Sequence, residues 1–248
     1  MKILRLSWAG IQLVVGETTI VIDLLENTTP LKSFMGEPLT EIVPLAGQHC
    51  VQIALLTHLH PDHYDPVALR RCLAPAGKVV CHRAIQTKIV ADKLLAQGVE
   101  LEQPFSQGGV TITAVAAVDG FGDPQVSWVV EGGGKKIIHC GDTLWHGHWW
   151  KIGRKHGPFD IAFLAINGAV TGFPGMEPSG IPADLTPEQA GAAGKILGAK
   201  AICPIHYDTF HFPPLYVQAA NAEQTFLAVA RARGIPVEIV KPGETVTA

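Results

Sequence analysis

The stretch His58-Leu59-His60-Pro61-Asp62-His63 places four potential metal ligands within six residues. It follows the apolar run Val51 to Thr57, which predicts a buried strand. Two histidines two positions apart in an extended segment project from the same face and can share one metal. Asp62 and His63 lie where the chain turns toward a helix that begins at Asp65-Pro66, so they can face a neighbouring position. The stretch therefore predicts a metal site at the end of a strand.

Two later strand-like runs also end at ligand-type residues. Asp142 follows the run Ile137 to Cys140 and a glycine, and His206 follows the run Lys200 to Ile205. Alone, each feature is common, because Gly-Asp turns and single histidines usually have structural roles. Three such strand ends in one chain favour a shared site. A carboxylate at Asp142 could then bridge two cations, one through each oxygen.

The rest of the chain predicts a single mixed α/β domain over residues 1–248. The opening runs Ile3 to Trp8, Ile11 to Val15 and Thr19 to Ile22 are separated by glycines, which is typical of an antiparallel meander. Residues 24–49 contain prolines and glycines with little periodicity, and we expect them to form a lid insertion. Further strands are expected at 78–81, 110–118, 127–130, 136–140, 161–166 and 200–205, and helices at 66–71, 85–95, 187–197 and 219–233.

Composition limits the classes of function. Charged residues make up 17% and hydrophobic residues 47%, which is typical of a globular chain, and the net charge of −3 gives no reason to expect a nucleic-acid partner. The five cysteines are odd in number and form no CxxC pair, which favours a reducing compartment. No signal-peptide pattern and no membrane-spanning run is recognisable. We therefore expect a cytoplasmic protein with a small-molecule substrate, and the sequence leaves the oligomeric state open.

The motifs together resemble the metallo-β-lactamase superfamily. Thr57 to Asp65 is similar to its HxHxDH signature, and Gly141-Asp142-Thr143 and Pro204 to Phe210 are similar to its later ligand motifs. Asp23 matches the acidic residue that supports the site. The resemblance is nearest to the branch of ascorbate-6-phosphate lactonases and N-acyl-phosphatidylethanolamine phospholipases. It implies a four-layer αβ/βα sandwich of two packed mixed β-sheets flanked by helices.

The resemblance also implies ligand roles. The first metal would be held by His58 and His60, the second by Asp62, His63 and His206, and Asp142 would bridge. The family usually supplies a third histidine to the first metal, and this sequence has Asp119 at that position. Asp119 either coordinates the metal in place of the histidine or forms an Asp-Gly turn. His139 and His146 are the alternative candidates for the third ligand. We expect one or two divalent ions, Zn²⁺ first, with Mn²⁺ and Fe²⁺ as alternatives because oxygen ligands favour harder metals.

The implied activity is hydrolysis by a metal-activated water acting on an ester, lactone or phosphoester of a small molecule. Asp62 and Asp142 are the expected catalytic residues. Four polar side chains near the motifs are candidates for substrate binding: His146, His148, Tyr207 and His211. One alternative is a phosphodiesterase acting on lipid or nucleotide. Another is a non-hydrolytic metal-binding sensor or redox protein, although the redox version of the family usually has Glu at the position of His60.

Overall fold

One sheet is built mainly from the first hundred residues. The computed structural model describes residues 1–247. The sheet has seven strands in the spatial order β15-β1-β2-β3-β4-β5-β6. Strands β1 to β3 form the expected antiparallel meander, and β3 to β6 are parallel. The bounds are β1 (Lys2–Arg5), β2 (Ile11–Val15), β3 (Thr18–Ile22), β4 (Val51–Leu55), β5 (Leu73–His82), β6 (Ala96–Val99) and β15 (Thr245–Val246).

The second sheet has six strands in the order β13-β11-β10-β9-β8-β7. Its antiparallel part includes the β9–β10 hairpin, whose turn contains Gly133 and Gly134, and β10, β11 and β13 are parallel. The bounds are β7 (Phe105–Gln107), β8 (Val110–Ala116), β9 (Val126–Gly132), β10 (Lys135–His139), β11 (Ile161–Ala165) and β13 (Ala201–Ile205). A separate pair joins β12 (Val170–Thr171) to β14 (Tyr216–Val217).

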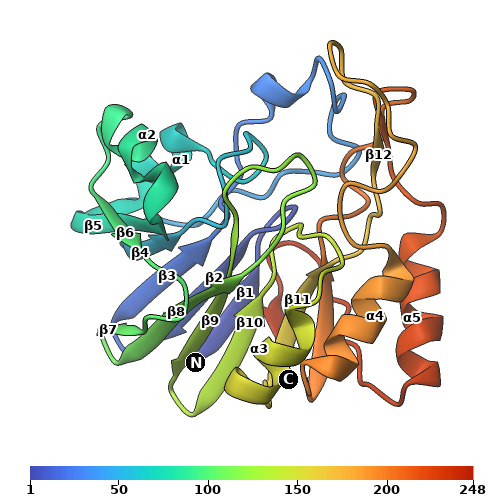
Figure 1. Ribbon diagram of the computed structural model, residues 1–248. Coiled ribbons are helices and arrows are strands. Elements are labelled where there is room, and N and C mark those ends of the chain that lie inside the picture. The colour runs from blue at the N-terminus through green and yellow to red at the C-terminus, as the bar shows by residue number, and fades with distance from the viewer. Residues whose placement is uncertain (248) are drawn as a thin grey trace.

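The two sheets pack face to face and helices cover their outer faces (Figure 1). Residues such as Leu13 and Val130 fill the core between the sheets. A second core packs α1 (Pro66–Cys72) and α2 (Gln86–Ala91) on the first sheet. A third packs α3 (Trp149–His156), α4 (Pro187–Ile196) and α5 (Ala222–Ala232) on the second. Two 3₁₀ turns, η1 (Thr29–Leu31) and η2 (Arg83–Ile85), complete the elements. The αβ/βα sandwich expected from the sequence is confirmed.

The structure corrects several predicted elements. The helix expected at 85–95 ends at Ala91, and Lys93 then takes the left-handed conformation (φ 62°), so residues 96–99 form strand β6 instead. The pair Trp149-Trp150 begins helix α3, which the sequence analysis had not predicted. Only one 3₁₀ turn interrupts segment 24–49, which is otherwise irregular as expected. No helix in residues 1–247 is long and apolar enough to cross a membrane.

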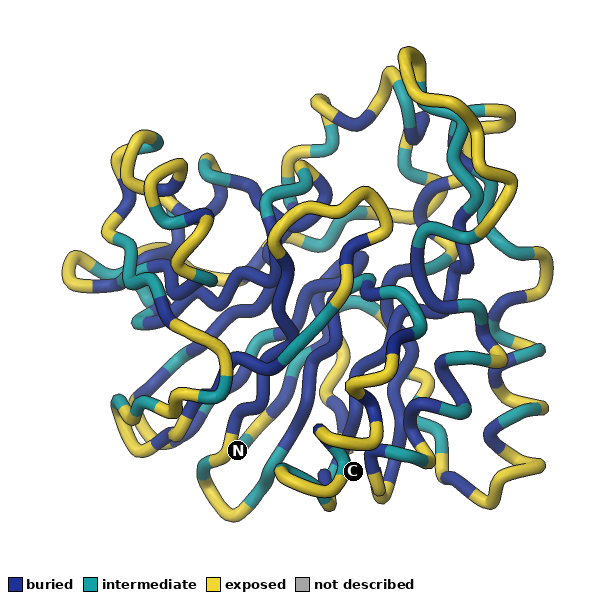
Figure 2. The backbone as a smooth tube through the Cα atoms, viewed as in Figure 1, coloured by how far each residue is buried: buried dark blue, intermediate teal, exposed yellow. Residues whose placement is uncertain are grey.

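Strands of both sheets end at the same edge of the sandwich. Parallel strands share the direction of their carboxyl ends, so β3 and β4 of one sheet and β10, β11 and β13 of the other point toward this edge, as does β8. The segments 24–49 and 167–186 rise above it, while both chain ends lie at the opposite side (Figure 1). The strands are buried and the outermost loop tips are exposed (Figure 2). The edge therefore receives side chains from segments far apart in sequence.

We predict that Asp65→Ala destabilises this edge. Asp65 Oδ1 accepts hydrogen bonds from the first turn of α1, at Val67 N and Ala68 N, and Oδ2 accepts from Glu26 N and Asn27 N. Losing a buried cap and two further bonds should lower the free energy of unfolding by roughly 2 kcal/mol or more. Urea denaturation measures it, and Asp65→Asn, which keeps one acceptor oxygen, should lose less. An Asp65→Ala midpoint equal to that of the wild type would contradict this double role.

Candidate metal centre

The HxHxDH stretch forms a tight turn between β4 and α1. The backbone N–H groups of His63 and Tyr64 both donate to the carbonyl oxygen of His60, at 3.0 and 2.9 Å. After this turn, Asp62 and His63 belong to a different group of potential ligands from His58 and His60, although the rings of His58 and His63 remain 4.2 Å apart. The sequence had predicted this separation into two pairs from the strand end and the following turn.

One group of potential ligands contains the residues expected to hold the second metal: Asp62, His63 and His206. All three are buried, and their ligand atoms lie within 4.8 Å of one another. Asp62 Oδ2 lies 3.2 Å from His206 Nε2 and 3.4 Å from His63 Nε2. The other group is His58, His60 and Asp142, again within 4.8 Å. Each group therefore offers three nitrogen or oxygen atoms around one point, as a transition metal requires.

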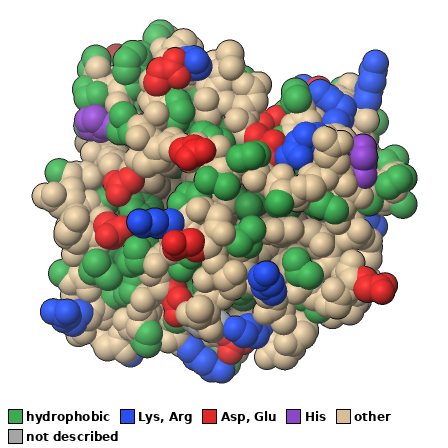
Figure 3. All heavy atoms as spheres, turned by 180° about the vertical axis from the view of Figure 1, so that it is seen from behind, with side chains coloured by type: hydrophobic (Ala, Val, Ile, Leu, Met, Phe, Trp, Pro, Cys, Tyr) green, Lys and Arg blue, Asp and Glu red, His purple; other side chains and the backbone are tan. Residues whose placement is uncertain are grey.

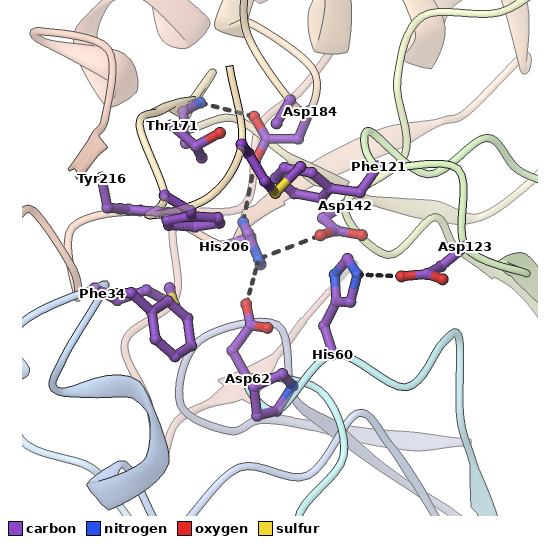
Figure 4. Close-up of a pocket in the computed structure, with 16 residues that line it drawn as sticks. Phe34, His60, Asp62, Phe121, Asp123, Asp142, Thr171, Asp184, His206 and Tyr216 are labelled. Carbon is purple, nitrogen blue, oxygen red and sulfur yellow. Dashed lines mark hydrogen bonds and ion pairs between the residues drawn. The ribbon is translucent and has the colours of Figure 1, made fainter. Parts of the chain in front are cut away.

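Asp142 lies between the two groups. Its Oδ1 is 3.7 Å from His58 Nδ1, while its Oδ2 is 3.6 Å from His63 Nε2 and 3.9 Å from His206 Nε2. Gly141 makes this possible, because its positive φ of 64° turns the chain sharply after β10. Figure 4 shows Asp62 and Asp142 pointing toward His206 among the residues that line the pocket. The structure thus places Asp142 where a bridging ligand would lie.

Two buried imidazole nitrogens support a fit to metal ions. His58 Nε2 and His63 Nε2 are inaccessible to solvent and have no hydrogen-bond partner among the described residues. A buried polar atom without a partner costs free energy, so such atoms are rare in native proteins. Imidazole nitrogens are preferred zinc ligands. The donor set and these unpartnered atoms together fit divalent cations at both groups.

The electrostatics of the centre reflect its density of carboxylates. Burial opposes charge on both Asp62 and His63. The combined effect of His63 and His206 on Asp62 outweighs it and lowers the pKa of Asp62, and the combined effect of Asp62, Asp142 and Asp23 on His63 outweighs it and raises the pKa of His63. Burial lowers the pKa of His58 to about 3, against the attraction of Asp142. His58 is therefore neutral near pH 7, which is the form that binds metal.

Asp23 and Trp8 hold the ligands in place. Asp23 accepts from the Thr57 backbone and hydroxyl, at 2.9 and 2.7 Å, and its Oδ2 lies 2.9 Å from His63 Nδ1. The indole N–H of Trp8 donates to Asp62 Oδ2 at 2.9 Å. Asp23, Trp8 and His206 all adopt positive φ angles, between 49° and 58°. Such strained conformations concentrate at functional sites, where the surrounding contacts maintain them.

Asp184 and Asn167 are supporting residues that the sequence analysis missed. His206 Nδ1 lies 3.3 Å from Asp184 Oδ2 and 3.2 Å from Asn167 Oδ1. Burial raises the pKa of Asp184 to about 6, against the lowering effect of His206. These contacts direct Nε2 of His206 toward Asp62, which is how a second carboxylate commonly orients a metal-binding histidine. Segment 167–186 has no periodic pattern from which Asp184 could have been predicted. The one feature that could have indicated a supporting residue is the polar Asn167 directly after the apolar run that forms β11.

Asp119 forms the turn that was one of its two expected roles, and it also lies near a potential metal ligand. Its Oδ2 accepts from Phe121 N and Asp123 N, at 2.7 and 3.0 Å, which closes the turn. Its Oδ1 faces His60 Nδ1 at 3.7 Å, and Asp119 belongs to a third possible ligand group with His60 and Asp123. Gly120 packs so closely against Ala183 that a Cβ would lie 2.2 Å from that carbonyl oxygen. This contact joins the turn to segment 167–186.

The four residues expected to bind substrate lie outside the pocket that borders the ligands. His146 stacks on Trp149 and accepts from the backbone of His148, at the start of α3. Tyr207 donates to Glu223 at 2.8 Å, and His211 accepts from the backbone of Gln218. His139, an alternative ligand, is instead hydrogen bonded to Ala9 O and Gly141 N. In this structure these side chains therefore contact other parts of the protein and do not line the pocket.

The pocket itself has a volume of about 280 Å³. Three irregular segments surround it: 24–49 contributes Phe34 and Met35, the turn after β8 contributes Phe121, and 167–186 contributes Phe173 and other residues. Its full lining is Phe34, Met35, His60, Pro61, Asp62, Phe121, Asp123, Asp142, Ala169, Thr171, Phe173, Met176, Ala183, Asp184, His206 and Tyr216. The potential ligands are thus reached through an opening formed by loops.

Comparison with known proteins identifies the family. The family model described as "Beta-lactamase superfamily domain" matches residues 18–207. This chain belongs to the metallo-β-lactamase superfamily. Within it, the chain is 30% identical to a UPF0173 metal-dependent hydrolase of Rubrobacter xylanophilus, over 77% of this chain and 76% of that protein. It is 29% identical to a UPF0173 metal-dependent hydrolase of Thermus thermophilus, over 98% of this chain and 97% of that protein. It therefore belongs to the UPF0173 family of metal-dependent hydrolases.

A solved structure agrees with this assignment at the level of the fold. Igni18, a metallo hydrolase from Ignicoccus hospitalis, superposes with a TM-score of 0.73 at 22% identity, covering 99% of this chain and 97% of the other. The four-layer architecture is thus that of the superfamily, and the chain is an enzyme of the metal-dependent hydrolase type. On the face shown in Figure 3, acidic and basic side chains are interspersed.

We predict that Asp142→Ala reduces bound metal more than His206→Ala does. Asp142 faces both ligand groups and His206 only one, so the first change should weaken both sites and the second mainly one. Elemental analysis after dialysis of the reconstituted protein measures the difference. His156→Ala, at the remote ion pair with Glu102, is the control and should keep the wild-type content. Full occupancy in Asp142→Ala would contradict the bridging position.

We predict that Asp184→Ala weakens metal binding by roughly 10- to 100-fold, because His206 loses a partner that orients it. Asp184→Asn should lose less, since its carbonyl oxygen can still accept from His206 Nδ1. Competition with a chelating dye gives the affinities, and Asp160→Ala, which removes a carboxylate paired with Lys200, is the control. Equal affinity in Asp184→Ala and the wild type would show that His206 is held by other contacts.

Proposed function

We propose that this enzyme hydrolyses an ester, lactone or phosphoester of a small molecule, using water activated by divalent metal at the two ligand groups. One observation carries the proposal: Asp142, which belongs to the group of His58 and His60, also faces His63 and His206 of the other group, and residues of both groups line the same pocket. Divalent cations bound there would lower the pKa of water and stabilise the negative charge that develops on the substrate oxygen. Zn²⁺ is the proposed ion at Asp62, His63 and His206, with Mn²⁺ and Fe²⁺ as alternatives.

Asp62 is the proposed residue that orients the attacking water. It lines the pocket, and Trp8 and His206 both contact its Oδ2, which fixes the carboxylate. A carboxylate with a lowered pKa accepts a hydrogen bond from water and aligns it for attack. Asp142 is held from the side by Gln125, whose amide donates to Oδ1 at 2.8 Å. Both carboxylates line the pocket.

Two finer assignments belong to the same proposal. Segment 24–49 contributes Phe34 and Met35 to the pocket, which supports its role as a lid that influences substrate choice. The five cysteines are free, which supports a location in the cytoplasm. The named relatives do not separate the lactonase branch from the phospholipase branch, so a phosphodiesterase acting on lipid or nucleotide is the competing substrate assignment. A histidine at position 60 continues to favour hydrolysis over redox chemistry.

We predict that Asp62→Asn lowers kcat/KM by about 100-fold or more, because the amide cannot accept and align water as the carboxylate does. The assay compares metal-reconstituted and chelator-treated protein on 4-nitrophenyl esters, lactones and bis(4-nitrophenyl) phosphate, with metal content measured in parallel. Asp160→Asn should behave as the wild type. Wild-type turnover by Asp62→Asn with full metal would contradict the role of Asp62, and no metal-dependent hydrolysis of any substrate would contradict the proposed function.

A further inference from the structure

We propose that the substrate is an uncharged ester or lactone whose apolar alkyl or aryl group packs on three phenylalanines of the pocket. This inference rests on the proposed function and specifies its substrate. It favours carboxylic esters and lactones over phosphoesters. Three independent features of the pocket carry it: an aromatic surface, the charge of the lining and the size of the space.

The aromatic surface consists of Phe34, Phe121 and Phe173, which we call the aromatic wall. Phe173 contacts Phe34 edge to face, with ring centroids 5.3 Å apart, and stacks on Phe121 at 5.7 Å. Phe121 in turn lies 5.6 Å from the ring of His60. The wall therefore extends continuously from a potential metal ligand, His60, to Phe34 on segment 24–49. Phe34, Phe121 and His60 are labelled in Figure 4.

The wall is assembled from all three loop segments. Phe34 comes from segment 24–49, Phe121 from the turn that Asp119 closes, and Phe173 from the loop after β12. Phe121 is 38% exposed, and Met176, which also lines the pocket, is 50% exposed. Contacts between such residues and a ligand would remove apolar surface from water, which favours binding of apolar groups.

The charge of the lining opposes an anionic substrate. Four carboxylates line the pocket, Asp62, Asp123, Asp142 and Asp184, and none of the lining residues in the described chain is Lys or Arg. The four positive charges of two divalent cations would only balance the four negative charges of these carboxylates. The negative charge of a bound phosphoester would then have no positively charged side chain to compensate it. Sites that select phosphate commonly supply Arg or Lys for this purpose. An uncharged carbonyl substrate avoids the penalty.

The size of the pocket limits the apolar group. A volume of about 280 Å³ lies near the lower end of small-molecule sites, which begin at roughly 300 Å³. Because the potential ligands occupy the base of the pocket, the reacting carbonyl would lie there and the apolar group along the wall. A water molecule releases one proton to bulk solvent and adds as hydroxide to the carbonyl carbon, the bond from that carbon to the alcohol oxygen breaks, and the proton of the resulting carboxylic acid passes to the departing alkoxide. The products are a carboxylate and an alcohol, joined in one molecule for a lactone.

The first test uses one leaving group with different acyl and phosphoryl parts. Metal-loaded protein is assayed on 4-nitrophenyl acetate, butyrate and hexanoate and on bis(4-nitrophenyl) phosphate, each corrected for uncatalysed hydrolysis. We expect kcat/KM to rise by up to about fourfold per added methylene until the pocket is filled. We expect the phosphodiester to be the poorest substrate relative to its uncatalysed rate.

Variants of the pocket separate apolar contact from charge. Phe173→Ala should reduce kcat/KM for the hexanoate more than for the acetate, while Trp150→Ala, an aromatic residue 47% exposed outside the pocket, should change neither. Met176→Lys should improve the phosphodiester relative to the esters, and Met176→Gln should not. These ratios compare substrates within one variant, so a partial loss of folded protein does not affect them.

The second test measures binding without chemistry. Calorimetry compares a δ-lactam carrying a hexyl chain, an uncharged and slowly reacting analogue of a lactone, with the parent lactam lacking the chain. The holoprotein should bind the hexyl lactam at least tenfold more tightly, and Phe173→Ala should remove most of that difference. Equal affinity for both lactams would overturn the inference, even if no ester were hydrolysed.

The outcomes distinguish this inference from the proposed function. Preference for the phosphodiester, or rates independent of chain length and of Phe173, would overturn the inference while leaving a metal-dependent hydrolase. Absence of hydrolysis with every substrate would contradict the proposed function, and lactam binding would then still decide whether the pocket selects uncharged apolar ligands.

Discussion

The position of Asp142 between two groups of imidazoles is the constraint on which the rest of the site depends. Its two oxygens face His58 on one side and His63 and His206 on the other, all within 3.9 Å. Buried carboxylates and imidazoles at this density must be compensated by opposite charge or by hydrogen bonds. Gln125 supplies one such hydrogen bond to Asp142. The left-handed conformation of Gly141 turns the chain so that Asp142 reaches this position.

The sandwich supplies this arrangement because strands of both sheets end at one edge. Asp62 comes from the loop after β4, and His206 follows β13, yet their side chains lie 3.2 Å apart. Asp23 after β3 and Asp184 near β12 then orient the histidines from opposite sides of the centre. Both sheets must be packed for the groups to meet, so the metal centre and the core between the sheets are expected to form together.

The sequence predicted the ligands more fully than their surroundings, for a physical reason. Strand ends can be recognised from apolar runs, so Asp62, Asp142 and His206 were identified as one site. Loops lack such periodicity, so Asp184 and the aromatic wall were missed, although segment 24–49 was expected near the mouth. His146 was predicted to bind substrate because it lies close to the Asp142 motif in the sequence, but its ring packs on Trp149 of helix α3, which was not predicted.

The central claim is that two metal sites share Asp142. Anomalous diffraction from crystals of the metal-reconstituted protein, collected above and below the absorption edge of the bound metal, tests it most directly. The account predicts two anomalous peaks, one beside Asp62, His63 and His206 and one beside His58 and His60, with Asp142 between them. Peaks confined to other residues, such as His146 and His148, or no peak at either group in metal-containing crystals, would contradict it.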